Sequence, residues 1–230
     1  MVKKLFLFSI FLSVLIFTTA ETWRITSLNW EPYCGSNIKN RGRLVVRLEN
    51  LLKDNDIKLK IKFYPWDESK KLAETENYIG YFPAWPEEVK DGFISSPQIG
   101  ISYIGIMTYK NSGVEFKELR SLFKNYKIGL IKTYVYPECI SNIVEKYRKN
   151  VVYVKNEKIL AYMLSTKGID AAITDPSVMK YYANRYGYNN IEVLNGKVIK
   201  RPLVISFQDT EKNRKRIKLL RKLLRKESQK

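Results

Sequence analysis

Patterns typical of strands and of helices alternate along this chain in two successive series. The first series begins with the strand-like segment Arg24–Leu28 and continues through the strictly alternating segment Lys58–Phe63. The second begins near Val114 and ends with the strand-like segment Ile191–Leu194. No internal repeat or low-complexity linker separates them. This arrangement predicts an α/β protein built from two units.

Two further segments predict how the units are joined. Ile101–Tyr109 is a β-prone run that is too long for one ordinary strand, so we expect it to cross from the first unit to the second. The final strand, Leu203–Phe207, and the helix from Thr210 to Lys226 lack a sheet of their own. We therefore expect this strand to pair with the sheet of the first unit, and the two chain crossings to form a hinge.

The N-terminus has the pattern of a secretory signal peptide. Lysines at positions 3 and 4 precede the largely apolar run Leu5–Phe17, and small residues follow as far as Ala20. An uncleaved membrane anchor is the alternative, but the run is a little shorter than the ~18 to 20 apolar residues that a membrane span needs. We expect residues 1–20 to be removed after Ala20 and the protein to be periplasmic.

The composition excludes several kinds of chemistry. The chain has no histidine, which removes Ser-His-Asp and Cys-His catalysis and most zinc sites, so we expect no metal and no cofactor. The formal net charge is +18, and Lys212–Lys226 alone contains nine basic residues and no acidic one. Such a run is able to attract nucleic acid or anionic lipid. Its apolar stripe favours a helix that packs on the first unit with its lysines in water, and export argues against a nucleic-acid partner.

Six short segments occur in the order and spacing of a known protein family. They are Asn29–Tyr33, Phe63–Trp66, Phe82–Trp85, Ser95–Pro97, Lys127–Leu130 and Gly168–Asp175. In these segments the chain resembles the family 3 extracellular solute-binding proteins, which are periplasmic receptors of polar amino acid importers. The resemblance covers nearly the whole chain from about Trp23 to Leu224.

The resemblance implies a two-lobed, type II periplasmic-binding-protein-like α/β fold with a ligand cleft between the lobes. Lobe I would comprise residues 21–107 plus 201–230, and lobe II residues 108–200. A small polar solute would be the ligand, and an inner-membrane ABC permease the partner of a monomeric protein. Closure of the cleft would be a hinge motion.

The chain departs from this family where amino-acid ligands are held. In amino-acid-binding members of this family, an arginine of lobe I binds the ligand carboxylate through two parallel hydrogen bonds. In this chain no arginine lies between Trp85 and Ile99, and the resemblance places Glu88 at that position. Lys90 is the nearest cation. Asp175 remains at the position that often meets a ligand ammonium. A free α-amino acid is therefore not expected to bind by the usual clamp.

Aromatic side chains of lobe I are the first candidates for ligand contact. Trp30, Tyr33 and Trp85 lie in or beside loops that follow strands, where open α/β sheets bind ligands, so we expect them to line the cleft. For Trp66, lining and core positions are equally consistent with the sequence. The alternative for all four is a core role, because large aromatic residues supply buried area.

Lobe II is expected to add polar contacts. Lys132, Thr133 and Tyr134 precede a helix that begins near Pro137, and free backbone N–H groups at a helix start attract anions. An ordinary strand–helix connection with a solvated lysine is the alternative. Asp175, followed by proline, is the expected N-cap of the next helix and is able to direct its second oxygen into the cleft.

The two cysteines and two of the carboxylates each allow either a structural or a functional role. Cys34 and Cys139 would lock the lobes together if they formed a disulfide, but two unpaired thiols are the favoured interpretation, since a bridge needs Cα atoms within ~7 Å. Glu31 and Glu88 are the only carboxylates expected in the cleft as catalytic candidates. Neither has an evident partner, so we expect a binding protein rather than a dehydratase-like or glycosidase-like enzyme. A basic interaction or sensor module without a transport ligand is the alternative function.

Overall fold

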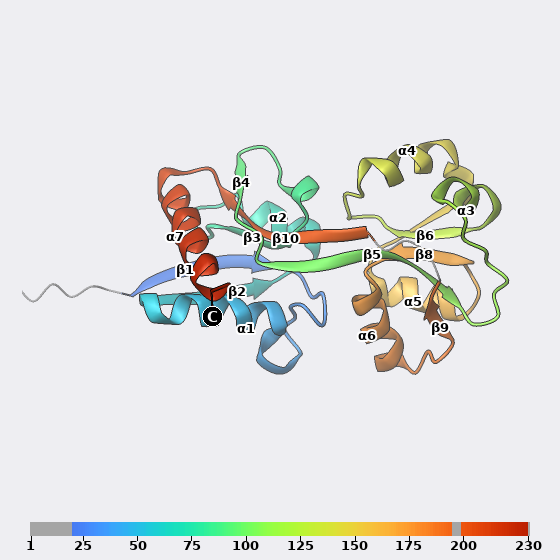
Figure 1. The fold of residues 1–230 in the computed structure, drawn as a ribbon, viewed down its shortest axis with the longest axis horizontal. Coiled ribbons are helices and arrows are strands. Elements are labelled where there is room, and N and C mark those ends of the chain that lie inside the picture. Colours follow the sequence, from blue (N-terminus) through green and yellow to red (C-terminus); the bar gives the residue numbers. More distant parts are fainter. Residues whose placement is uncertain (1–19, 195–198, 230) are drawn as a thin grey trace, which may run out of the picture.

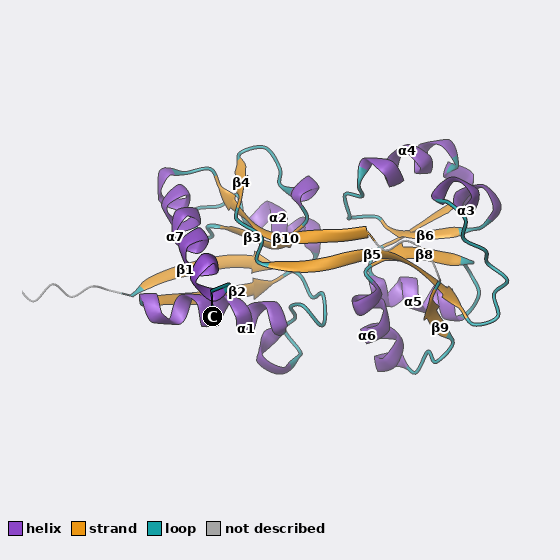
Figure 2. Ribbon diagram, viewed as in Figure 1, coloured by secondary structure: helices purple, strands orange, loops and turns teal. Residues whose placement is uncertain are grey.

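The computed structural model describes residues 20–194 and 199–229, and these form two lobes joined by two long strands (Figure 1). Both lobes are mixtures of strands and helices (Figure 2). The predicted signal peptide lies outside the described residues except for Ala20, which is exposed. No helix in the described part of the chain is long and apolar enough to cross a membrane.

Lobe I is built on the sheet order β2-β1-β3-β10. Strand β1 (Glu21–Ser27) pairs in parallel with β2 (Ile57–Phe63) and with β3 (Gly80–Ala84). The alternation of lysines and apolar residues places Leu59 and Ile61 of β2 in the core. Helices α1 (Arg43–Leu52), α2 (Trp66–Leu72) and α7 (Glu211–Glu227) belong to this lobe.

The last strand completes lobe I, as the sequence predicts. Strand β10 (Ile199–Gln208) pairs antiparallel with β3 and with the short strand β4 (Phe93–Ser95), which the sequence patterns did not indicate. Trp23 of β1 and Phe207 of β10 meet edge to face with ring centroids 5.7 Å apart. Residues from the two ends of the chain therefore share one core.

Lobe II contains a second group of strands. Strand β6 (Ile128–Ile131) pairs in parallel with β7 (Val151–Val154) and β8 (Ala171–Thr174), while β9 (Ile191–Val193) pairs with β5 (Gly100–Tyr109). Its helices are α3 (Leu119–Asn125), α4 (Glu138–Lys146), α5 (Glu157–Ser165) and α6 (Pro176–Tyr186). Asn156 and Asp175 cap α5 and α6 with their side chains, as predicted.

The connection between the lobes is a two-stranded ribbon. Residues 100–104 of β5 pair antiparallel with residues 199–203 of β10, and the two strands run side by side from one lobe to the other (Figure 1). Beyond this ribbon, β5 pairs with β8 and β9, whereas β10 pairs with β3 and β4. We propose that this ribbon is the hinge, and we keep the lobe boundaries 21–107 plus 201–230 and 108–200 as a proposal.

One local prediction is wrong. The sequence after Pro65 predicts that Asp67 caps a short helix, but α2 begins at Trp66 directly after Pro65, which provides no side-chain cap. Asp67 instead lies in the first turn, where a carboxylate interacts favourably with the helix dipole, and it pairs with Lys70 at 3.0 Å.

Gly80 tests the closure of lobe I by β10. A Cβ atom at this position would lie 2.1 Å from the carbonyl oxygen of Ser206 in β10, so β3 and β10 could not keep their spacing. We expect Gly80→Ala to lower the free energy of unfolding in urea by on the order of 2–4 kcal/mol. Gly168→Ala is the matched control, because its nearest neighbour would lie at 3.4 Å. Equal stability of the two variants would contradict this account.

Candidate functional site

An aromatic loop of lobe I faces lobe II. It follows β1, and its turn is closed by hydrogen bonds between Trp30 and Cys34. The first N–H groups of α1 donate to the carbonyl oxygens of Pro32 and Tyr33, which fixes the loop against the helix. Gly42 permits this approach, because its φ is +103° and a Cβ atom there would lie 2.5 Å from the Tyr33 oxygen.

The tryptophans of lobe I are packed against each other and against lobe II. Trp30 stacks on Tyr33 with ring centroids 4.5 Å apart and meets the edge of Trp85 at 6.4 Å. Trp85 in turn meets Tyr134 of lobe II at 5.1 Å. The crevice left among Trp30, Trp66, Trp85 and Tyr134 has a volume of about 10 Å³, room for a single water molecule at most. Side chains of the protein itself thus fill the centre of the interlobe contact.

Two polar contacts join the lobes beside this aromatic cluster. The hydroxyl of Tyr33 donates to Asp175 Oδ2 at 2.8 Å, and the hydroxyl of Tyr182 donates to Glu31 Oε2 at 2.7 Å. Asp175 is fully buried and accepts four hydrogen bonds: Oδ2 also accepts from the backbone N–H of Tyr103, while Oδ1 accepts from Ser177 and Val178 at the start of α6. Both oxygens of Asp175 are therefore engaged within the protein, and neither is directed into an open cleft.

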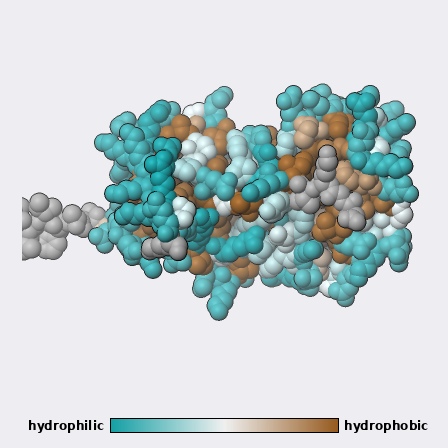
Figure 3. Space-filling view, in the orientation of Figure 1, coloured by the Kyte–Doolittle hydropathy of each residue, from teal (hydrophilic) through white to brown (hydrophobic). Residues whose placement is uncertain are grey.

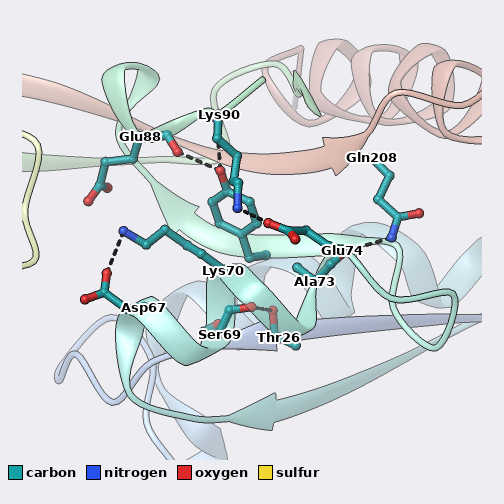
Figure 4. A network of polar contacts seen from close by, with 10 residues as sticks. Thr26, Asp67, Ser69, Lys70, Ala73, Glu74, Glu88, Lys90 and Gln208 are labelled. Atoms are coloured by element: carbon teal, nitrogen blue, oxygen red, sulfur yellow. Dashed lines mark hydrogen bonds and ion pairs between the residues drawn. The ribbon is translucent and has the colours of Figure 1, made fainter. Parts of the chain in front are cut away.

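Glu88, which the resemblance places where the family's clamp arginine would lie, is buried. Its carboxylate accepts hydrogen bonds from the Trp66 indole and from the backbone N–H of Trp85, both at 2.9 Å. Burial raises the pKa of Glu88 to about 7, against the opposing effects of these two donors and of Lys70. Figure 4 shows Lys90 paired with Glu74.

A second carboxylate with a raised pKa lies in lobe II. Burial raises the pKa of Glu157 to about 7, and the charges of Asp175 and Glu31 act in the same direction, whereas its own backbone N–H and the Trp30 indole lower it. Tyr134 donates a hydrogen bond to Glu157. The Trp30 indole N–H is buried and does not reach hydrogen-bond geometry with any acceptor in the described residues. Glu157 thus places a buried carboxylate beside Tyr134 and Trp30 of the aromatic cluster.

Outside this cluster a wider cleft of about 690 Å³ remains between the lobes. Lobe I borders it with the loop after β1 and with residues 63–67, and lobe II borders it with the loop after β6, the start of α5 and the face of α6. Its four cations all come from lobe II and have no ion pair within the described residues: Lys132, Lys155, Lys158 and Arg185.

The structure divides the eight predicted ligand residues into two groups. Trp66, Lys132, Thr133 and Tyr134 line the cleft, and Trp66 is also 95% buried, so the lining and core alternatives both hold for it. The other four, Trp30, Tyr33, Trp85 and Asp175, lie behind the cleft in the interlobe contact. Their contact with a ligand stays a prediction.

The helix that presents its N-terminus to the cleft is α5, not the predicted one. Residues 155–158 line the cleft, whereas none of the first residues of α4 does. The carboxyl ends of the parallel neighbours β6 and β7 meet at one edge of the sheet, but only residues 155–156 separate β7 from α5, whereas residues 132–137 separate β6 from α4. The cap at Asn156 was visible in the sequence, but the neighbouring position of the two strands was not.

The two cysteines are free, as the favoured interpretation expected. Cys34 is buried in the aromatic loop, its thiol donates to the Leu28 carbonyl oxygen at 3.3 Å, and burial raises its pKa to about 12. Cys139 is exposed on α4.

Comparison with known proteins identifies the architecture. No family model and no curated protein sequence matches this chain. Among solved structures, a histidine kinase sensor domain with similarity to periplasmic binding proteins superposes with a TM-score of 0.77 at 14% identity, over 92% of this chain and 93% of that one. This chain has the periplasmic-binding-protein fold.

Amino-acid-binding proteins show the same fold. An ancestral arginine-binding protein with bound arginine gives a TM-score of 0.75 at 15% identity, covering 92% of this chain and 94% of that chain. An arginine-transport periplasmic binding protein from Legionella pneumophila gives 0.69 at 18% identity, covering 90% and 94%. The fold is therefore that of polar amino acid-binding proteins, and binding proteins and sensor domains both use it.

The two interlobe tyrosines test whether the lobes are held together by their own side chains. Replacing Tyr33 and Tyr182 together by Phe leaves two buried carboxylates with fewer donors. We expect the free energy of unfolding to fall by about 1–3 kcal/mol and the radius of gyration from small-angle X-ray scattering to increase. Tyr64→Phe is the control, because the Tyr64 hydroxyl bonds Tyr78 within lobe I. An unchanged radius of gyration in the double variant would refute the interlobe role.

Glu88 predicts a specific dependence of stability on pH. The folded state binds the Glu88 proton more tightly than the unfolded chain, so this group stabilises the fold at low pH. That contribution is lost as the pH rises from 4.5, the ordinary pKa of a glutamate, through about 7, the pKa of Glu88 in the folded protein. Glu88→Gln mimics the protonated carboxyl. We expect it to gain on the order of 2 kcal/mol relative to the wild type between pH 5 and pH 8.

The exposed loop residue Glu76 provides the control for this measurement. Glu76→Gln should follow the wild-type dependence of unfolding free energy on pH. If Glu88→Gln also follows the wild type, the Glu88 carboxyl is not buried in the way described.

Proposed function

We propose that this chain is an exported, monomeric binding protein that captures a small polar solute between its two lobes and delivers it to an inner-membrane ABC importer. The observation that carries this proposal is the cleft of about 690 Å³ bordered by both lobes. Its volume falls within the range of ligand sites, about 300–1,000 Å³. The periplasmic-binding-protein fold supports capture by hinge closure, with the β5–β10 ribbon absorbing the rotation.

We further propose that the solute carries an anionic group held by lobe II. Lys132, Lys155, Lys158 and Arg185 border the cleft without ion pairs. The negative residues of the cleft are largely occupied, because Glu31 accepts from Tyr182, Glu157 from Tyr134, and Asp67 pairs with Lys70. The excess of free cations therefore favours a ligand with negative charge.

Binding rather than catalysis is supported by the state of the two candidate carboxylates. Glu31 and Glu88 are both buried, and each carboxylate is held by donors of the protein. Hydrolysis of a glycoside needs two carboxylates that flank the scissile bond of a substrate placed between them. Glu88 lies behind the aromatic cluster and does not line the cleft.

A sensor or interaction module is the second candidate function. One observation favours it: the packing of Trp85 on Tyr134 and the bond between Tyr33 and Asp175 hold the lobes together through the protein's own side chains. A two-lobed domain that is closed without a solute is able to signal through its conformation alone. This alternative predicts that no small solute stabilises the protein.

A thermal-shift screen decides between these proposals. We expect small organic anions to raise the unfolding midpoint with concentration, while free α-amino acids, polyamines and short peptides raise it less. Lys132→Ala should weaken binding of the anion by about tenfold, since a hydrogen bond to a charged group contributes about 1.5–3 kcal/mol. Lys149→Ala, an exposed lysine of the same lobe away from the cleft, should leave binding unchanged.

Two outcomes would count against the binding proposal. If no compound shifts the midpoint, the sensor or interaction function is favoured instead. If a free amino acid binds with sub-micromolar affinity, and neither Lys132→Ala nor Asp175→Ala weakens it in calorimetry, then the ligand site lies elsewhere.

A further inference from the structure

Helix α7 carries an unusual density of unpaired positive charge. Of its nine basic residues, Arg214 pairs with Asp209 at 2.6 Å and Arg216 pairs with Glu21 at 2.5 Å. The remaining seven are exposed and have no ion pair within residues 20–194 and 199–229: Lys212, Lys215, Lys218, Arg221, Lys222, Arg225 and Lys226. These seven residues are called the basic face below.

The basic face is a continuous stripe because of the helical period. Lys215, Lys218, Lys222 and Arg225 follow one another at spacings of three or four residues, which places them on one side of the helix. The opposite side is buried in lobe I, where Leu220 is inaccessible and Ile217 nearly so. Leu219 and Leu223 are half-buried against the same core. The apolar residues of α7 are thus committed to lobe I, and only charge is presented outward.

The location of α7 separates this surface from the cleft. None of its residues lines the interlobe cleft. The ion pair between Arg216 and Glu21 places the first half of the helix beside the first residue of β1, and Glu227 near its end pairs with Arg47 of α1 (Figure 1). In Figure 3 the surface over this helix is hydrophilic.

We propose that the basic face docks the protein on the anionic headgroups of a membrane. Clusters of Lys and Arg bind anionic lipid surfaces electrostatically, with each residue near the surface increasing binding roughly fivefold. A groove of about 330 Å³ between Lys218, Arg221, Lys222 and Arg225 provides room for phosphate groups. Docking through this face leaves the interlobe cleft accessible. The docking proposal holds whichever solute the cleft binds.

Other polyanions fit the basic face less well. Helix α7 contains no aromatic residue, whereas proteins that bind single-stranded nucleic acids stack bases on aromatic side chains. The stripe also lacks an exposed apolar anchor of the kind that dominates protein–protein interfaces. A regular row of charges without such anchors matches a fluid surface of charged headgroups.

Co-sedimentation with lipid vesicles tests this proposal on residues 21–230, which contain every described helix and strand. We expect binding to vesicles that contain phosphatidylglycerol and little binding to vesicles of phosphatidylcholine alone. Because the apolar side of α7 is buried in lobe I, binding should be electrostatic and fall steeply as the salt concentration rises from about 0.05 to about 0.5 M. Binding that persists in high salt would overturn the proposal, since it would indicate insertion.

Charge-neutralising variants assign the binding to α7. Replacing Lys218, Arg221, Lys222 and Arg225 together by Gln should weaken partition to the anionic vesicles by nearly three orders of magnitude, roughly fivefold for each residue, while Gln keeps the helix propensity. The control replaces Lys58, Lys60 and Lys62 by Gln, which removes exposed lysines of the edge strand β2. Its effect should be less than about fivefold.

The same variants give the result that would overturn the proposal. Thermal unfolding first verifies that both variants are folded. If the α7 variant binds anionic vesicles as well as the control does, the basic face is not the docking surface. If the wild type binds an acidic protein or nucleic acid but not anionic vesicles at equal salt, the partner is a different class of molecule.

Discussion

The buried carboxylate of Asp175 is the interaction on which the arrangement of the two lobes depends. One of its oxygens caps α6, and the other accepts from Tyr103 in the strand that joins the lobes and from Tyr33 in lobe I. A buried carboxylate is costly unless donors surround it, so the loop that carries Tyr33 must remain against lobe II. The same aspartate thus contacts the start of α6, the strand that joins the lobes and the aromatic loop of lobe I.

The aromatic cluster packs around the buried carboxylate of Glu88. The Trp66 indole and the backbone N–H of Trp85 donate to this carboxylate, and the Trp85 ring extends to Tyr134 of the other lobe. Packing of the protein's own rings thereby occupies the centre of the cleft, and the free volume lies further out, beside cations from lobe II.

Positive charge is used differently on the two lobes. In lobe II it borders the cleft, at residues near the start of α5 and on α6. In lobe I it forms a stripe on α7, whose apolar side completes the core beside β1 and β10. One helix therefore stabilises the fold through its leucines and presents a charged surface through its lysines and arginines.

The sequence by itself determined the two α/β units, the crossing strand, the caps at Asn156 and Asp175 and the absence of the arginine, because these depend on local periodicity and residue type. It also determined that the last strand joins the first unit. Only the tertiary structure decided that Trp30 and Trp85 pack against each other, that Asp175 is fully engaged, and that α5 rather than α4 borders the cleft. Those facts depend on which strands become neighbours and how closely the lobes approach, and side chains distant in sequence meet only after both are fixed.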